Sequence, residues 1–234
     1  MKKSKSECDA NSCFMCRNCL QQWQPAIAAN KKNFKVKRGE VIFNEGDAVK
    51  GVYFVYEGIV KVHKKWGAEK ELIIRFAAKG AIFGHRGLGG NNVYPISATA
   101  LEDSIICFVE IDFFESTLKV NTDFTYSLMM FFASELQESE KKMRNLAHMS
   151  VKGRVGQSLI SLQGQFGTKE DGSINIELSR QDLASYAGAT YETVFRVLTD
   201  MLKEGIIESA GKKIIVKDEQ KLLALTAEQA QKPI

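Results

Sequence analysis

The chain has 234 residues, of which 44% are hydrophobic and 26% charged, and its formal net charge is only +4. These values are typical of a globular protein with a sizeable core, and they exclude a disordered or fibrous chain. The length allows one large domain or two ordinary ones. The longest apolar run, residues 128–133, is much shorter than the ~18 residues that a membrane helix requires.

The N-terminus is basic but no apolar segment follows it, so we expect no secretory signal and a cytoplasmic protein. In that compartment the 5 cysteines stay reduced, and their clustering near one end favours metal or redox chemistry over disulfides. Residues 150–234 carry 11 basic and 11 acidic side chains. Composition alone therefore indicates neither nucleic acid nor a membrane as a partner, and a DNA-binding function needs a sequence motif.

Residues 33–109 contain short apolar or alternating runs, separated by turn residues such as Gly46, Gly58 and Gly80. Short strands at this regular spacing predict a small antiparallel barrel or roll. The β-rich part is expected to end near Glu110. The predicted strands are residues 41–43, 52–56, 59–62, 71–76 and 104–109.

Residues 113–149 lack both Gly and Pro, which predicts a long helix. Within it, apolar residues recur alternately three and four positions apart, as in a coiled coil. We expect residues 124–132 to pack on the chain's own β-rich part, and the narrow stripe from Leu136 onward to meet a second copy in a constitutive dimer. This dimer seam consists of Met129, Phe132, Leu136, Ser139, Met143 and Leu146.

The C-terminal part begins with a predicted helix over residues 152–166, closed by Gly164 and Gly167, and a short strand over 175–178. Ser179-Arg180-Gln181-Asp182 is a capping box that opens a helix through Ala187.

After a turn at Gly188-Ala189, Thr190 caps a second helix that is predicted to run through Lys203. A β-hairpin of residues 206–208 and 214–216, turning about Ala210-Gly211, follows it. Helix, turn, helix and hairpin in this order indicate a winged helix-turn-helix, whose second helix enters the major groove of DNA.

Glu192 and Arg196 lie four residues apart near the start of this second helix and share one face. Arginine is the best bidentate donor to guanine, and a carboxylate accepts from cytosine N4, so the pair can read neighbouring base pairs. The alternative is an ordinary Glu–Arg surface pair. The residues expected to turn inward are Val194, Val197, Leu198 and Leu202. The expected DNA backbone contacts are Ser179, Arg180, Thr190, Thr193, Lys212 and Lys213.

The stretch LSRQDLASYAGATYETVFRVL, residues 178–198, resembles the recognition unit of the Crp/Fnr family of bacterial transcription regulators. KRGEVIFNEGD and YFVYEG, residues 37–47 and 53–58, resemble that family's cyclic-nucleotide-binding-type β-roll. The resemblance covers residues 20–218. It implies a homodimer that binds a two-fold symmetric DNA site, with RNA polymerase as a further partner.

Glu192 and Arg196 match the family's base-reading Glu and Arg, which implies a central G·C step in the operator. Tyr191 and Phe195 stand where smaller or polar residues are common in the family. The resemblance implies an α+β fold in four parts. These are a cysteine-rich segment at 1–19, a β-roll sensor domain at 20–111, a dimerisation helix at 112–149 and a winged helix-turn-helix DNA-binding domain at 150–234.

The resemblance does not extend to cAMP. In the family an Arg-Ser pair holds the cAMP phosphate and a Glu binds the ribose, but here Tyr94-Pro95 takes the place of the pair and His85 lies about where the Glu would be. A buried phosphate without an arginine is poorly compensated, and Arg86 has the wrong spacing to substitute. We therefore expect no cAMP binding.

Cys13, Cys16 and Cys19 repeat at a short spacing that is typical of [4Fe–4S] ligands rather than of structural zinc. Residues 94–107 resemble the oxygen-sensing Fnr branch, which implies Cys107 as a fourth ligand, although that branch has a longer gap before its third ligand. Cys8 is the alternative fourth ligand. Zinc, or cysteines that hold no metal, are the remaining alternatives.

Other classes of function are alternatives to a DNA-binding regulator controlled by an iron–sulfur cluster. Haem, nitric oxide or another small ligand in the roll could control the same DNA-binding output, and His85 is the only histidine in the loop region. No catalytic role is expected, because Gly-x-Ser-x-Gly, a phosphate-binding Gly-Lys-Ser/Thr and His-Glu-x-x-His are all absent from the sequence. A further alternative is a regulatory cyclic-nucleotide-binding module that does not bind DNA, and the complete winged helix argues against it.

Overall fold

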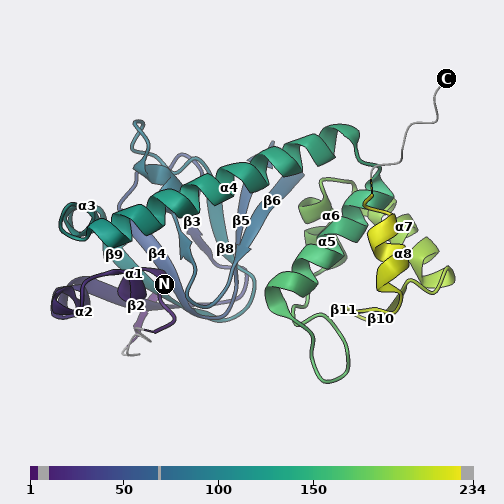
Figure 1. The fold of residues 1–234 in the computed structure, drawn as a ribbon, viewed down its shortest axis with the longest axis horizontal. Coiled ribbons are helices and arrows are strands. Elements are labelled where there is room, and N and C mark those ends of the chain that lie inside the picture. Colours follow the sequence, from purple (N-terminus) through teal and green to yellow (C-terminus); the bar gives the residue numbers. More distant parts are fainter. Residues whose placement is uncertain (5–10, 68–69, 228–234) are drawn as a thin grey trace. The chain divides into compact units, whose positions relative to one another are not determined.

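The computed structural model describes residues 1–4, 11–67 and 70–227. The chain divides into two compact units, Met1–Leu136 and Gln137–Ile234 (Figure 1). Helix α4, Thr122–His148, contributes to both units. Within the described ranges, no helix is long and apolar enough to cross a membrane.

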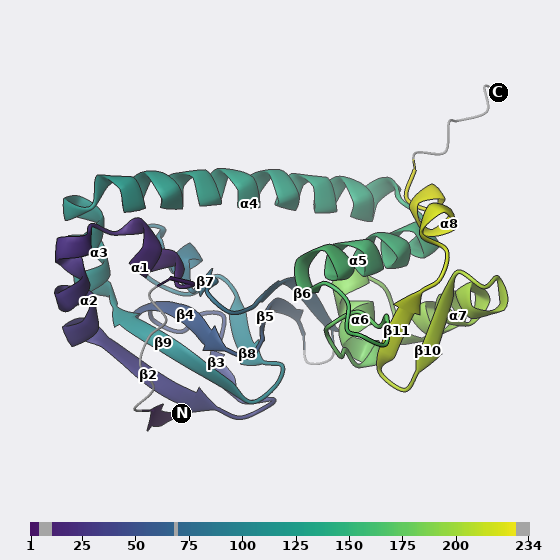
Figure 2. The same ribbon diagram turned by 60° about the horizontal axis from the view of Figure 1, so that its bottom comes forward.

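The first unit is a roll of two antiparallel sheets, with strand orders β1-β2-β9-β4-β7 and β3-β8-β5-β6. Strands distant in the sequence lie side by side, as Figure 2 shows for β2, β9 and β4. The strands are β1 Lys2–Ser4, β2 Lys31–Val36, β3 Val41–Phe43, β4 Gly51–Glu57, β5 Val60–Trp66, β6 Lys70–Ala77, β7 Ile82–Phe83, β8 Ser97–Ala100 and β9 Ser104–Glu110.

Aromatic and aliphatic side chains from both sheets form the inner core of the roll. The rings of Phe43 and Tyr94 are stacked with 3.9 Å between their centroids, and those of Tyr53 and Phe83 lie 5.3 Å apart. Burying one large apolar side chain contributes about 1.5–3 kcal/mol. The ring cluster is therefore a major source of stability for the roll.

A second hydrophobic cluster, the outer core, joins the five-stranded sheet to the helices around it. Because side chains alternate across a strand, Ile106 of β9 belongs to the inner core and its neighbour Cys107 to the outer core. The helices that contribute are α1 Phe14–Asn18, α2 Gln24–Asn30, α3 Ile111–Val120 and the first half of α4 (Figure 2). Two 3-10 turns, η1 Gln21–Trp23 and η2 His85–Leu88, complete the unit.

All five predicted strands are confirmed as β3, β4, β5, β6 and β9, and the β-rich part ends at Glu110 as expected. Strands β1, β2, β7 and β8 are missing from the prediction. The sequence of β8 is SATA and that of β2 is KKNFKV, so neither has a strong apolar alternation. Their strand conformation comes from pairing with distant segments.

The prediction of one helix over residues 113–149 is wrong, because Asn121 separates α3 from α4. Asn121 is buried and has non-helical backbone angles, φ −109° and ψ 87°. Its side-chain amide donates to the Thr117 carbonyl, and its Oδ1 accepts from the Leu20 N–H at 2.8 Å. Side-chain bonds of this kind compete with the helical ladder, which accounts for the break.

Helix α4 has two kinds of apolar residue. Phe124 and Leu128 are buried in the outer core, which confirms the expected packing of this part on the roll. Met129 and Phe132 fall in the same stretch but are exposed. All six residues of the predicted dimer seam are exposed in the single chain: Met129, Phe132, Leu136, Ser139, Met143 and Leu146.

The second unit holds helices α5 to α8 and a two-stranded antiparallel sheet. Buried side chains include Leu159 of α5, Leu183 of α6 and Val194 of α7. The remaining elements of the unit are α5 Val151–Phe166, α6 Arg180–Ala187, α7 Tyr191–Lys203, β10 Ile207–Ala210, β11 Lys213–Val216 and α8 Glu219–Ala224. Roll, long helix and winged helix-turn-helix together make the predicted α+β fold.

The predicted strand over residues 175–178 is wrong. Ile176 and Leu178 are buried and their neighbours exposed, as in a strand, but no ladder forms and only bridges at Ser173 and Ile174 are present in this part of the described chain. Burial alone therefore accounts for the alternation. The sequence does not predict α8 either.

Three smaller expectations are also corrected. Gly164 does not end a helix, because α5 continues to Phe166 and Gly167 follows it as the cap. The hairpin turns at Gly211-Lys212, one residue later than predicted. Leu202 is exposed and Met201 is buried in its place.

Candidate nucleic-acid interface and sensor region

The turn between α6 and α7 is fixed by local hydrogen bonds, as the sequence predicts. The Ser179 hydroxyl accepts from the Asp182 N–H at 3.0 Å and opens α6, and Thr190 Oγ1 accepts from the Thr193 N–H at 3.3 Å and opens α7. Between them Gly188 has left-handed angles, φ 63° and ψ 46°, which glycine adopts without steric cost. The start of α7 is thus held at a defined angle to α6.

Arg154 of α5 also fixes this turn, and the sequence analysis misses it. Its guanidinium donates to the carbonyls of Met149, Ala187 and Gly188 at 2.8 to 3.1 Å. These carbonyls lie before α5 and at the end of α6, where the helical ladder leaves acceptors open. The only sequence signal is that Arg154 is one of two basic residues, with Lys152, among the mostly small and apolar residues of α5.

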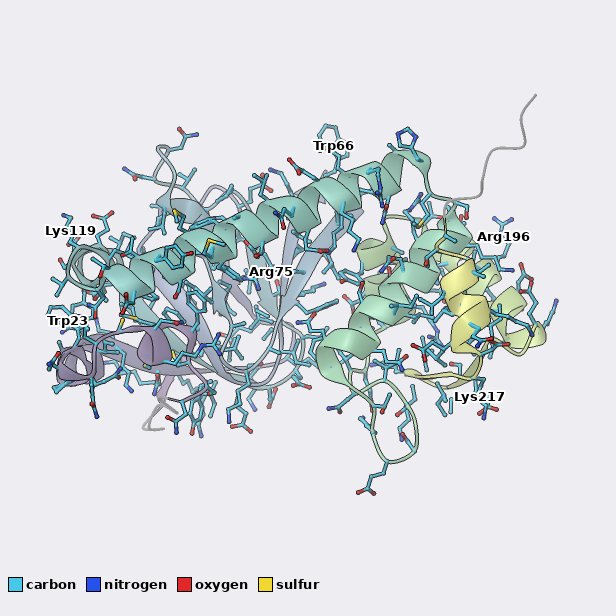
Figure 3. All side chains as sticks on the ribbon, in the orientation of Figure 1. Trp23, Trp66, Arg75, Lys119, Arg196 and Lys217 are labelled. Atoms are coloured by element: carbon cyan, nitrogen blue, oxygen red, sulfur yellow. The ribbon has the colours of Figure 1, made fainter. Side chains whose placement is uncertain are left out.

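Glu192 and Arg196 are both exposed on α7, one helical turn apart. Figure 3 shows Arg196 extending from the helix into solvent. No ion pair joins the two side chains in the described part of the chain. Their donors and acceptors therefore remain available to a ligand at the N-terminal half of the helix.

The predicted backbone contacts differ in how far they are already engaged. The Arg180 guanidinium donates to Ser209 Oγ and to the Gly211 carbonyl, and burial lowers the pKa of Arg180. Lys213 Nζ bonds to Asp171 Oδ2 at 2.6 Å, which raises the pKa of Lys213. The hydroxyls of Ser179, Thr190 and Thr193 serve the helix caps. Lys212 is exposed at the hairpin turn.

Tyr94, which takes the place of the family's phosphate-binding arginine, is part of the inner core of the roll. Tyr94 is buried, and its hydroxyl donates to the Gly51 carbonyl at 2.7 Å. Gly84 has φ +80°, and a Cβ there would lie 3.1 to 3.5 Å from the rings of Tyr53, Phe43 and Tyr94. The glycine-rich turn thus packs closely against aromatic rings.

A buried ion cluster connects the roll to α4, and the sequence analysis does not find it. Glu135 Oε1 lies 2.7 Å from Arg75 Nε, and its Oε2 lies 2.8 Å from His85 Nε2 and 3.2 Å from Arg86 Nε. Arg75 comes from β6 and His85 and Arg86 from η2. Figure 3 places Arg75 at the roll beneath α4. Glu135 is the first of several charged residues in the second half of α4, so the sequence does not distinguish it from the exposed ones that follow.

Burial alone would raise the pKa of Glu135, but the hydrogen bond from His85 and the two guanidinium charges outweigh it and hold this pKa at about 2. Burial lowers the pKa of His85, and both arginines oppose a further positive charge. His85 is therefore neutral at neutral pH and donates from Nε2 to the carboxylate. Its Nδ1 has no hydrogen-bond partner among the described residues.

The predicted metal ligands Cys13, Cys16 and Cys107 are buried in the outer core, and Cys19 packs against it. Burial, and then the charge of Cys13, raises the pKa of Cys19 to about 12. In the described ranges, however, no three Cys, His, Asp or Glu side chains are close enough together to hold a metal ion. Cys8 lies outside the described residues.

The cysteine segment is attached to the roll by its backbone at Gly80. The Phe14 N–H donates to the Gly80 carbonyl at 3.0 Å. Gly80 has φ +83°, and a Cβ added there would lie 2.1 Å from the Ser12 carbonyl oxygen, so only glycine permits this approach.

The same segment also contacts the helices. The Phe14 ring lies 6.0 Å from that of Phe124 and 5.4 Å from that of Phe131, both in α4. Trp23 Nε1 donates to Thr117 Oγ1 of α3 at 3.1 Å, and Trp23, labelled in Figure 3, stacks on Phe113. The segment around the cysteines is therefore in direct contact with α3 and α4.

A β-roll with a long helix, and a winged helix-turn-helix with an exposed polar pair on its second helix, define a class of DNA-binding proteins. Comparison with known families agrees: the cyclic nucleotide-binding domain matches residues 33–121 and the Crp-like helix-turn-helix domain residues 153–225. The chain belongs to the Crp/Fnr family and is a DNA-binding transcription regulator.

Its relatives include proteins with different signals. The anaerobic regulatory protein of Bacillus subtilis is 31% identical over 188 residues, which cover 78% of this chain and 79% of the relative. A CRP-like cAMP-activated global transcriptional regulator of Mycobacterium tuberculosis is 26% identical over 202 residues, covering 84% and 90%. The structure of FixK2 from Bradyrhizobium japonicum has a TM-score of 0.76 and 26% identity, covering 86% and 99%.

Proposed function

We propose that this chain is a homodimeric regulator that reads a two-fold symmetric DNA site with Glu192 and Arg196, and that an iron–sulfur cluster on its cysteines makes this activity respond to oxygen or redox state. The exposed, unpaired state of Glu192 and Arg196 on α7 is the observation that carries the DNA-reading part. Arg196 donates to guanine and Glu192 accepts from cytosine in the major groove.

The DNA backbone is held by groups around this pair. Lys212 and Lys213 at the hairpin, Arg180 beside it, and the capping side chains Ser179, Thr190 and Thr193 position the unit on phosphates. Since Lys213 is paired with Asp171, Lys212 contributes the larger share of the charge. Lys212→Ala is expected to weaken binding equally for all sequences and to reduce the salt dependence by about one phosphate contact.

The homodimer forms through the dimer seam of α4. Leu136, Met143 and Leu146 are exposed apolar residues on one stripe, and their burial against a second copy removes this surface from water. Sedimentation of the whole protein at micromolar concentration is expected to show a dimer, and Met143→Glu is expected to give monomers. A mostly monomeric wild-type protein would contradict this arrangement.

We also propose RNA polymerase as a partner, as the resemblance to the family implies.

The signal part rests on the cysteines. Cys13, Cys16, Cys19 and Cys107 bring four thiols to one apolar cluster, and soft thiolates are the ligands that iron–sulfur clusters take. Burial raises the pKa of Cys19 to about 12, and binding to iron would favour the thiolate form of these cysteines.

When bound, the cluster supplies a group that oxygen can oxidise. The chain's own part is transmission: Phe14 and Trp23 link the cysteine segment to α4 and α3, and Gly80 links it to the roll. The filled inner core disfavours cAMP or haem as the signal, and His85 is already bonded to Glu135. Zinc, a different small ligand or nitric oxide remain alternative outcomes of the test.

The test is anaerobic purification of the full chain, with iron and acid-labile sulfide analysis and a visible spectrum. The proposal expects about four irons per chain, and a marked loss in Cys16→Ser. Met15→Leu is the matched control, because Met15 is buried in the same cluster but offers no thiolate. A colourless protein without iron would overturn the cluster and leave the DNA-reading part standing.

Selection from a random double-stranded DNA library tests the DNA-reading part. We expect a two-fold symmetric site with a G·C pair in each half, and Arg196→Ala should lose the preference for that pair. A library that yields no preferred sequence would contradict the proposed function.

A further inference from the structure

Two aromatic side chains lie uncovered on α7, where a folded protein normally keeps apolar surface small. Tyr191 is 43% exposed and Phe195 is 55% exposed. Their rings are stacked, with 6.3 Å between centroids and 17° between planes. The core side of the same helix is already filled by Val194, Leu198 and Met201, which are all buried. The two rings therefore do not serve the core of this unit.

The ring pair lies beside the polar pair that the proposed function uses. In an α-helix each residue turns by about 100°, so Tyr191 and Phe195 form one stripe and Glu192 and Arg196 form the next. Both stripes begin in the first turn of α7. N-terminal residues of the second helix are those that reach base edges in this type of unit. The rings are thus placed to enter the same groove as Glu192 and Arg196.

We propose that Phe195 and Tyr191 read the methyl groups of thymines in the major groove, next to the base pair read by Arg196. This inference rests on the proposed DNA-reading function and adds a second, apolar specificity to it. The operator half-site then requires A·T pairs with defined strand polarity beside its G·C pair.

The chemistry of the groove leaves few alternatives for a phenylalanine. The C5-methyl group of thymine is the apolar group that the major-groove edge presents, while the other edge groups are hydrogen-bond donors or acceptors. The ring of Phe195 can neither donate nor accept. The ring spacing of 6.3 Å is close to two base-pair steps of 3.4 Å, so the two rings can reach thymines that lie two positions apart in a half-site.

The ring of Tyr191 contacts that of Phe195, at 6.3 Å between centroids. Arg180, one of the proposed phosphate contacts, is bonded to Ser209 and Gly211 of the hairpin. The hairpin side of the unit therefore holds the proposed phosphate contacts, and the two rings stay together on α7.

The exposed stripe of Tyr191 and Phe195 could instead bind a protein partner. Leu202 of the same helix provides a control that separates the two possibilities. Leu202 lies on the same side of α7, about two turns beyond Phe195, and is 41% exposed. A docked protein would use the whole stripe, including Leu202. Base reading uses only the N-terminal rings.

The experiment starts from the site selected in the random-library experiment. Each thymine of that site is replaced in turn by deoxyuridine, which removes only the methyl group, and binding of the full-length protein is measured by fluorescence anisotropy at fixed salt. At two thymines per half-site we expect about a fourfold loss of affinity for each methyl group removed. Phe195→Ala and Tyr191→Ala should each bind the thymine site more weakly and lose the response to deoxyuridine at one of these positions.

Leu202→Ala and Trp66→Ala are the matched controls. Leu202 is an exposed apolar residue on the same stripe, and Trp66 is an aromatic residue that is 82% exposed in the other unit. Both variants should keep the wild-type response to deoxyuridine. Circular dichroism and melting temperature should be unchanged in all four variants, since none of these side chains is buried.

The outcomes separate this inference from the proposed function. If the wild-type protein selects a G·C-containing site but tolerates deoxyuridine everywhere, thymine reading is overturned and the function of Arg196 stands. The inference is also overturned if Phe195→Ala retains the full deoxyuridine response, or if Leu202→Ala loses it. If no sequence is selected at all, the proposed function fails first.

Discussion

Two groups of acidic and basic side chains in this molecule, a cluster around Glu135 and the pair Glu192 and Arg196, have similar chemistry and opposite surroundings. Glu135 of α4 is buried between Arg75, His85 and Arg86. Glu192 of α7 is exposed, with Arg196 one turn away and no ion pair between them within the described chain. The carboxylate oxygens of Glu135 accept from groups inside the protein, whereas those of Glu192 are open to solvent.

This difference shows which charges hold a fold and which are free to recognise a ligand. A buried charge is tolerated only where partners compensate its lost hydration, so each member of the Glu135 cluster depends on the others. An exposed pair gains little from its own contact, because water screens it. It can exchange that water for base edges at small cost.

The largest expected effect is on stability. Glu135→Gln leaves Arg75 buried without its counter-charge, and loss of one partner from a buried pair typically costs 3–5 kcal/mol. Chemical denaturation of the first unit within the whole chain should show this loss. Glu138→Gln, on an exposed part of the same helix, should change the free energy of unfolding by less than about 0.5 kcal/mol. If the two variants lowered the free energy of unfolding equally, the distinction between buried and exposed carboxylates would be contradicted.

Acid should weaken the buried cluster next. The folded-state pKa of Glu135 is about 2, against an ordinary value of 4.5, so its contribution is complete above pH 4.5 and is lost as the pH falls toward 2. A shift of this size corresponds to about 3 kcal/mol. Denaturation curves at a series of pH values should converge for the wild type and Glu135→Gln as the pH falls. Parallel curves would show that Glu135 is not held ionised.

DNA affinity should respond to the exposed pair and not to the buried one. Arg196→Ala is expected to lose about 1–3 kcal/mol per half-site on the selected DNA, with the melting temperature unchanged. Lys203→Ala removes one positive charge from the far end of α7 and controls for general electrostatics. A similar loss in both variants would mean that Arg196 acts only through its charge.

The smallest effect is the coupling between Glu192 and Arg196. A double-mutant cycle of unfolding free energies should give less than about 0.5 kcal/mol, since the two make no ion pair in the described residues. The same cycle for Glu135 and Arg75 should give a coupling free energy that is several times larger. A strong coupling on α7 would restore the surface-pair interpretation and weaken the base-reading one.

The recognition unit follows from the sequence because its determinants are local. Ser179, Gly188 and Thr190 act within three or four residues of themselves, so the bounds of α6 and α7 and the exposure of Glu192 are all predicted. Arg154 is different, because its three carbonyl partners include two that are more than thirty residues away.

The strands and the buried ion cluster of the roll are harder to predict from the sequence. β8 and β2 form by pairing with distant strands, and the burial of Glu135 depends on η2 and β6 reaching α4. The same limitation explains the error at residues 175–178, where alternating burial occurs without a neighbouring strand. Patterns along one segment give its own periodicity, but not the partner that makes it a strand or buries a charge.

Gly80 has a consequence for how such a regulator could change over many generations. A Cβ at this position would lie 2.1 Å from the Ser12 carbonyl oxygen and would push away the backbone of that residue. One replacement there would release the N-terminal segment and leave the winged helix intact. Under the proposed function, a single codon change would thus remove the response to the signal, while the cysteines and helix α7 stay unchanged.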